Sequence, residues 1–205
     1  MNVYVESNFV LELALLQEQH GSCSQIVDLA VEGHIHLVIP AYSLVEPYET
    51  LIRFFKKRRA IAEDVNTELK QLGRSAPYEE QTDTLQEQFT ALFIRNEEEE
   101  RNRLRNTLEQ LLEVAELIPL TTTVINNSLQ QQQQDFSPQD AVVYSSVLEH
   151  LANADGDDHV FLNLNRKDFD DPEVQDRLEE MGCKILFRFD RGIGYIRSRL
   201  NDQEA

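Results

Sequence analysis

Short runs of β-branched and aromatic residues alternate with stretches of helical periodicity along this chain of 205 residues. The runs predict five strands, at residues 3–5, 36–39, 117–120, 160–162 and 184–187. Apolar residues at helical spacing separate them, for example Val10, Leu13 and Ala14 after the first run. Strands that alternate with helices form βαβ units, in which the strands lie parallel. The sequence therefore predicts an α/β fold built on a parallel five-stranded sheet.

The longest helical pattern lies between the second and third runs. Apolar residues recur at helical spacing from Leu44 to Leu69, and the segment 73–77 contains Gly and Pro, which interrupt helices. A second helical pattern begins at Tyr78 and continues for about 38 residues, or roughly 55 Å. Its four consecutive glutamates, 97–100, are expected to form a solvated face. We predict one domain over 1–205, with a helical hairpin inserted at 55–116.

The chain is strongly acidic, with 37 acidic and 19 basic residues and a formal net charge of −18. Such a balance argues against a general nucleic-acid binder and against binding to anionic membranes, but it permits a local acidic cation site. The charge is uneven, because residues 76–116 hold 11 acids against 4 bases. No apolar run approaches ~20 residues, the N-terminus lacks a signal-peptide pattern, and Cys23 and Cys183 are far apart. A cytoplasmic protein without membrane association is expected.

Polar residues follow the predicted strands at the edge where parallel α/β sheets form their sites. Four are acids and two are asparagines: Glu6, Glu46, Asp140 and Asp168, with Asn163 and Asn165. Carboxylates that converge repel one another unless a cation lies among them. Mg²⁺ or Mn²⁺ is the natural occupant, and such ions activate water for attack on a phosphodiester.

Each acid also has a purely structural interpretation. Residues 43–46 fit a capping box, in which Glu46 satisfies a helix end. Asp140 follows the helix start Ser137-Pro138 and suits the positive end of the helix dipole in any case. Glu6 can be an exposed acid at a strand end, and Asp168 can belong to an acidic turn.

Four segments together resemble the PIN-domain family. They are residues 3–10, residues 38–40 with Glu46, the pair Asp140-Ala141, and residues 161–169. The resemblance covers about 1–54 and 117–190, and it implies a three-layer α/β/α fold and a Mg²⁺- or Mn²⁺-dependent ribonuclease. By this resemblance Glu6, Glu46 and Asp140 bind the ion, Asp168 is the fourth acid, and Asn163 or Asn165 orients the attacking water. Many bacterial relatives are toxins of toxin–antitoxin pairs, which implies an antitoxin partner, and PIN-like proteins often form homodimers.

Three positions depart from the family pattern. Glu6 stands where an Asp is usual, Asn163 stands where Thr or Ser is usual, and Asn165 stands where an Asp often follows. These departures support an alternative function, a catalytically degenerate PIN-like module that binds a partner through its hairpin. A phosphatase is a third reading, but no nucleophilic Asp ends the first strand and no glycine-rich phosphate loop is present.

Two basic clusters are candidates for RNA contact. The densest begins two turns after Glu46 on the same predicted helix and consists of Arg53, Lys56, Lys57, Arg58 and Arg59. The second lies near the C-terminus and consists of Arg188, Arg191, Arg197 and Arg199. Such residues position RNA through its phosphates. In the alternative interpretation they pair with nearby acids such as Glu63 and Asp64.

Overall fold

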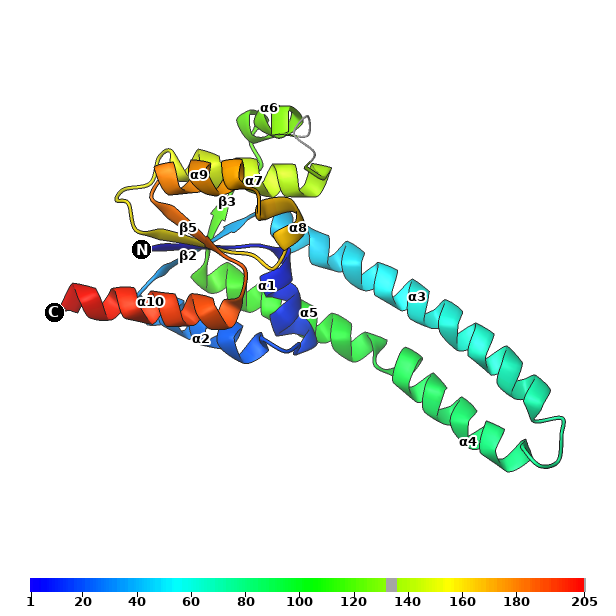
Figure 1. Ribbon diagram of the computed structural model, residues 1–205. Coiled ribbons are helices and arrows are strands. Elements are labelled where there is room, and N and C mark those ends of the chain that lie inside the picture. Colours follow the sequence, from blue (N-terminus) through cyan, green and yellow to red (C-terminus); the bar gives the residue numbers. More distant parts are fainter. Residues whose placement is uncertain (132–135, 205) are drawn as a thin grey trace. The chain divides into compact units, whose positions relative to one another are not determined.

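The computed structural model describes residues 1–131 and 136–204. Five parallel strands form one sheet in the order β3-β2-β1-β4-β5 (Figure 1). The strands are β1 (Asn2–Val5), β2 (His36–Pro40), β3 (Glu116–Ile118), β4 (His159–Leu162) and β5 (Cys183–Leu186). The predicted parallel α/β fold is therefore confirmed. The third strand ends at Ile118, before the predicted end, because Pro119 has no backbone N–H to donate.

Helices cover both faces of this sheet (Figure 1). One face carries α7 (Pro138–Leu151) and α9 (Pro172–Glu180), with α6 (Thr122–Gln131) packed on α7 and the short α8 (Arg166–Phe169) leading into α9. The other face carries α1 (Ser7–Leu15), α2 (His20–Val31) and α10 (Phe189–Glu204). Tyr4 and Phe161 are aligned on neighbouring strands, and both pack in the core beneath α7. The expected three layers are present.

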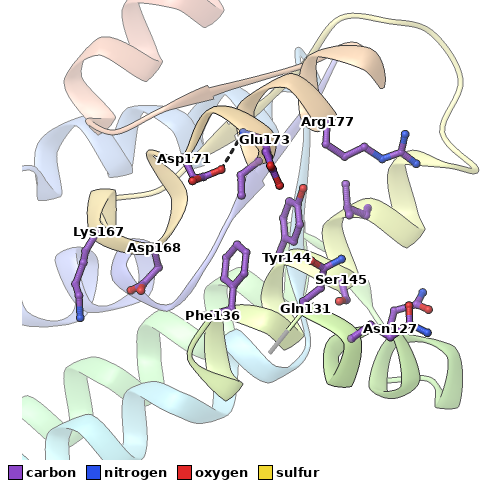
Figure 2. Close-up of a pocket in the computed structure, with 13 residues that line it drawn as sticks. Asn127, Gln131, Phe136, Tyr144, Ser145, Lys167, Asp168, Asp171, Glu173 and Arg177 are labelled. Carbon is purple, nitrogen blue, oxygen red and sulfur yellow. Dashed lines mark hydrogen bonds between the residues drawn. The ribbon is translucent and has the colours of Figure 1, made fainter. Parts of the chain in front are cut away.

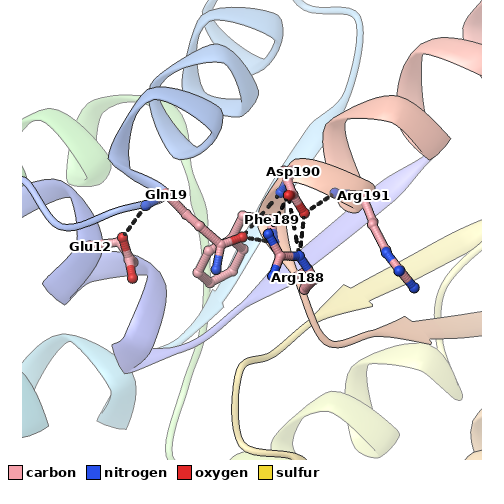
Figure 3. Close-up of polar contacts among 6 residues, drawn as sticks. All are labelled: Glu12, Gln19, Arg188, Phe189, Asp190 and Arg191. Carbon is pink, nitrogen blue, oxygen red and sulfur yellow. Dashed lines mark hydrogen bonds and ion pairs between the residues drawn. The ribbon is translucent and has the colours of Figure 1, made fainter.

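The start of α10 is anchored by the side chain of Gln19, the N-cap residue of α2. The Gln19 Oε1 atom accepts hydrogen bonds from the backbone N–H groups of Phe189, at 2.8 Å, and Asp190, at 3.3 Å (Figure 3). The backbone N–H of Gln19 in turn donates to Glu12 Oε2 at 2.8 Å. These bonds satisfy helix ends that would otherwise lack partners, and they join α1, α2 and α10 into one layer.

Most of the length of the long helices lies in a second compact unit. One unit comprises Met1–Pro47 with Asn106–Ala205, and the other is Tyr48–Arg105. The helices are α3 (Tyr42–Leu72), α4 (Glu79–Thr90) and α5 (Glu97–Val114), and the break at 73–77 is where the sequence predicts it. The second arm is not one continuous helix, because a π-helical turn at Ala91–Arg95 interrupts it and shifts the phase of its side chains. A single domain over 1–205 with an insertion at 55–116 stays a prediction.

Ion pairs join the two arms of this hairpin. Arg59 binds Glu97 through two hydrogen bonds, and Arg58 binds Glu100 with a closest distance of 2.7 Å. The predicted solvated glutamate face is wrong for Glu97, which is only 6% exposed, because the opposite arm covers it. The arginines pair across the hairpin, over about 40 positions, rather than with their neighbours Glu63 and Asp64.

The helices described over 1–131 and 136–204 include none with the length and apolar character needed to cross a membrane.

Candidate functional site

Glu6 is a buried acid at the carboxyl end of the central strand. It occupies the N-cap position of α1, and its side chain is buried, with 6% of the residue exposed. Its Oε2 accepts a hydrogen bond from Ser7 Oγ at 2.7 Å, whereas its Oε1 has no hydrogen-bond partner among the described residues. The pKa of Glu6 is raised to about 7, mainly by burial and also by the charges of Glu46 and Asp140, while hydrogen bonds from Ser7 and the Asn8 backbone act in the opposite direction. Glu6 is therefore not the exposed strand-end acid of the structural interpretation.

Asp140 lies in the first turn of α7, where Ser137 fixes its carboxylate. The Ser137 Oγ atom accepts from the Asp140 backbone N–H at 3.2 Å and donates to Asp140 Oδ2. The predicted helix start, with Ser137 as N-cap and Pro138 next, is confirmed. Burial raises the pKa of Asp140, and the charge of Asp168 adds to this, while hydrogen bonds from Ser137 and Asn165 oppose it.

Asn165 joins two of the acids. Its Nδ2 donates to Asp140 Oδ1 at 3.0 Å and to Asp168 Oδ2 at 2.8 Å. The loop after β4 holds Asn165 in place, because its backbone N–H donates to the side-chain Oδ1 of Asn163 at 2.6 Å. Asn163 is fully buried, and its Nδ2 has no partner within the described part of the chain. This bridging role of Asn165 was not foreseen from the sequence.

Glu46 completes the set from the first turns of α3. Its side chain is partly exposed, and its charge contributes to the raised pKa of Glu6. The capping-box interpretation fails, because α3 already begins at Tyr42 and the Ser43 hydroxyl has no partner among the residues described. The charges of Glu46 and Asp140 thus repel the charge of Glu6, and the charge of Asp168 repels that of Asp140.

The donor set suits a divalent cation that keeps most of its water. Over residues 1–131 and 136–204, no three His, Cys, Asp or Glu side chains are arranged to hold a metal ion together. Mg²⁺ needs only one or two carboxylates beside its waters. Glu6 Oε1 is a buried carboxylate oxygen without a partner, and its acid is destabilised by two other acids. A cation here would relieve that repulsion, so the residues fit Mg²⁺ or Mn²⁺.

The basic clusters differ in how much of their charge is already paired. In the first cluster Arg53, Lys56 and Lys57 are exposed, and Arg53 donates to Thr50 Oγ1 at 2.8 Å. Arg58 and Arg59 are engaged with the glutamates of α5. In the second cluster Arg188 pairs with Asp190 at the start of α10, and Arg199 pairs with Asp158 at 3.2 Å. Lys56 and Lys57 in the first cluster and Arg197 in the second are exposed, and no ion pair involves them among the described residues.

We compared the chain with known proteins. Among solved structures, the chain is similar to a chain of the crystal structure of VapBC2 from Rickettsia felis bound to a DNA fragment from their promoter. The identity is 11%, the TM-score is 0.43, and the likeness covers 91% of this chain and 98% of that one. No curated protein matches the sequence. The sequence profile of the PIN domain matches residues 3–169, which is most of the chain and includes all six candidate site residues. This chain is therefore a member of the PIN-domain family.

Proposed function

We propose that this protein is an endoribonuclease that hydrolyses RNA phosphodiester bonds with Mg²⁺ or Mn²⁺. The observation that supports it most is the state of Glu6, a buried carboxylate with one oxygen unpartnered among the described residues and with two acids raising its pKa. A buried charge without an opposite charge is costly, so such a site is maintained where a ligand supplies that charge.

We assign each residue a role in this reaction. Glu6, Glu46 and Asp140 would have to move together to hold the divalent ion, because no three acids of the described residues are arranged to hold one in the metal-free protein, and Asp168 would be the fourth acid. A bound divalent ion supplies positive charge for the phosphate and lowers the pKa of water. Ser137 fixes the Asp140 carboxylate, and Asn165 holds the carboxylate of Asp168.

Asn163 is the residue that we propose to orient the attacking water. Its Nδ2 is buried at the end of β4 and has no other partner among the described residues, so it is free to donate. Arg53, Lys56 and Lys57 would attract the RNA backbone, and this contribution should weaken with added salt. An antitoxin partner and a homodimer stay predictions that accompany this function.

A degenerate binding module is the second candidate, and one contact favours it. The amide of Asn165 donates to both Asp140 and Asp168, so these two acids already share a neutral donor. If that arrangement persists, the acids have little need of a cation. The two candidates differ in calorimetry, where the nuclease predicts Mn²⁺ binding near one equivalent and the degenerate module predicts none.

The direct test is cleavage of a fluorescent single-stranded RNA by the purified full-length protein. We expect cleavage with Mn²⁺ or Mg²⁺, none in EDTA, and none by Asp140→Asn, whose circular dichroism spectrum should match that of the wild type. Asp176→Asn, an exposed acid on α9, is the matched control and should cleave normally. Cleavage that persists in EDTA or in Asp140→Asn would refute the proposal.

A further inference from the structure

A cavity of about 580 Å³ lies beside Asp168, among α6, α7 and α9 (Figure 2). This volume is within the usual range of small-molecule sites, roughly 300–1,000 Å³. Asp168 belongs to both the cavity and the acid cluster, because its side chain lines the cavity and its Oδ2 accepts a hydrogen bond from Asn165 at 2.8 Å. A ligand in this cavity would therefore lie next to the acid cluster.

One wall of the cavity is aromatic. Phe136 and Tyr144 both line it, and their rings are stacked with centroids 5.3 Å apart and planes 11° apart. Val174 extends the apolar surface. Both rings belong to the buried core, with 8% of Phe136 and 3% of Tyr144 exposed, and are therefore fixed in position. This fixed apolar wall favours a partly apolar ligand.

Uncharged polar groups on another part of the cavity wall can form hydrogen bonds with a ligand. Asn127 and Gln131 contribute amides from α6, and Ser145 contributes a hydroxyl from α7. An amide both donates and accepts, as the edge of a nucleobase does. Ser145 is 1% exposed, and its Oγ has no hydrogen-bond partner among the described residues. Buried polar groups are normally hydrogen-bonded, so this hydroxyl indicates a ligand that would satisfy it.

The charge of the cavity lining distinguishes a nucleobase from a phosphate group as the ligand. Among the described residues that line the cavity, Asp168, Asp171 and Glu173 are acidic, and Lys167 and Arg177 are basic. Arg177 is already paired with Glu180 at 3.0 Å. A net negative lining repels phosphate but accepts a neutral ring. The cavity thus fits the base of a nucleotide better than its phosphate.

We propose that this cavity, the base pocket, binds one nucleobase of the RNA beside the acid cluster. The proposal rests on the proposed ribonuclease function and adds to it a contact that selects which nucleotide lies next to the cleaved bond. A nucleobase reaches the pocket either as part of an RNA chain or as a free mononucleotide, and the ring chemistry is the same in both cases.

The test measures binding without cleavage. Full-length protein in EDTA is titrated with fluorescent ten-nucleotide RNAs of single-base composition, and separately with each of the four nucleoside monophosphates. Two variants remove pocket groups, Asn127→Ala and Ser145→Ala. Each has a neighbour as its control, because Asn126 is also exposed on α6 but is not among the residues that line the pocket, and Ser146 donates to the Val142 carbonyl instead.

We expect wild-type protein to prefer one RNA composition, and Asn127→Ala and Ser145→Ala each to weaken that binding about fivefold. Asn126→Ala and Ser146→Ala should leave it unchanged. Competition by the matching monophosphate would support the proposal with a free nucleotide as an additional ligand, and its absence would support it with the RNA chain as the ligand. Equal binding by pocket variants and controls, or no binding by the wild type, would overturn it.

These results separate the base pocket from the proposed nuclease. Selective loss of binding in the pocket variants, together with no cleavage in Mn²⁺, would keep the pocket and refute the nuclease. Cleavage that needs Asp140, together with equal binding by all four variants, would keep the nuclease and refute the pocket.

Discussion

The sheet unit and the helical hairpin treat buried acids in opposite ways. In the hairpin, Glu97 is buried against Arg59, so its charge is neutralised by a partner of opposite sign. At the sheet edge, the hydrogen bonds that Glu6 and Asp140 receive from described residues come from uncharged donors, among them Ser7, Ser137 and Asn165. The first arrangement cancels the charge of the acid, whereas the second leaves the charge uncancelled and Glu6 Oε1 without a partner among the described residues. The difference distinguishes an acid whose charge is neutralised within the fold from acids whose charge, on the proposed function, a cation would neutralise.

The largest expected effect on RNA cleavage comes from removing the charge of one acid at the sheet edge. Asp168→Asn should lower metal-dependent RNA cleavage on the order of a thousandfold, because a metal site supplies several kcal/mol of transition-state stabilisation. Asp170→Asn is the control, since Asp170 is exposed two positions later and contacts Gln175. Single-turnover rates with saturating Mn²⁺ measure the effect. Similar rates for the two variants would remove Asp168 from the site.

The next effect concerns stability and its dependence on pH. The folded-state pKa of Glu6 is about 7 and the ordinary value is 4.5, so the folded metal-free protein binds a proton more tightly than the unfolded chain. Proton binding by Glu6 therefore stabilises the folded protein fully below pH 4.5, and this stabilisation is lost as the pH rises towards 7 and above. Glu6→Gln should be more stable than the wild type at pH 8 in EDTA by about 3 kcal/mol.

Urea unfolding at pH 5 and pH 8 measures this difference. The advantage of Glu6→Gln should shrink at pH 5, and added Mn²⁺ should stabilise the wild type but not the variant. A variant that is less stable than the wild type at pH 8 in EDTA would show that the Glu6 carboxylate has a partner in solution.

A smaller effect is expected when the neutral bridge becomes an acid. Asn165→Asp removes the donor shared by Asp140 and Asp168 and adds a negative charge beside them. We expect Mn²⁺ affinity to rise about tenfold in calorimetry, since ligand charge tunes affinity for hard cations. The metal-free variant should melt at a lower temperature than the wild type. Unchanged affinity would favour the degenerate module over the nuclease.

The smallest effect should come from the paired acids. Arg59→Ala leaves the buried Glu97 without its partner, and this should speed amide exchange in α5 several-fold. Lys57→Ala, an exposed neighbour, is the control. Cleavage of a short RNA by Arg59→Ala should equal that of the wild type, because no site acid is altered. A large loss of cleavage would mean that Arg59 contacts RNA, as the sequence predicts for the whole basic cluster.

The hydrophobic periodicity of the sequence was sufficient to predict the fold. The ends of the predicted strands were sufficient to choose the candidate acids. Alternating strand and helix patterns are local signals, and the position of Glu6 or Asp168 after a strand is visible in the sequence itself. The bridging role of Asn165 was not predictable, because it depends on side-chain directions from α7 and the loop after β4. The pairing of Arg59 with Glu97 was missed for a related reason: the partners are distant in sequence, and only the packed arms bring them together.

The strand order also influences the order in which the strand pairs form during folding. The pairs β1–β2 and β4–β5 join residues close along the chain, as in Asn2 with His36 and His159 with Cys183. The central pair β1–β4 joins Val3 to Val160 and must close a much longer loop. Local contacts form fastest, so this central seam is expected to close late. Glu6 and Asn163 follow the two strands of that seam, and a partly folded chain therefore lacks the assembled acid cluster.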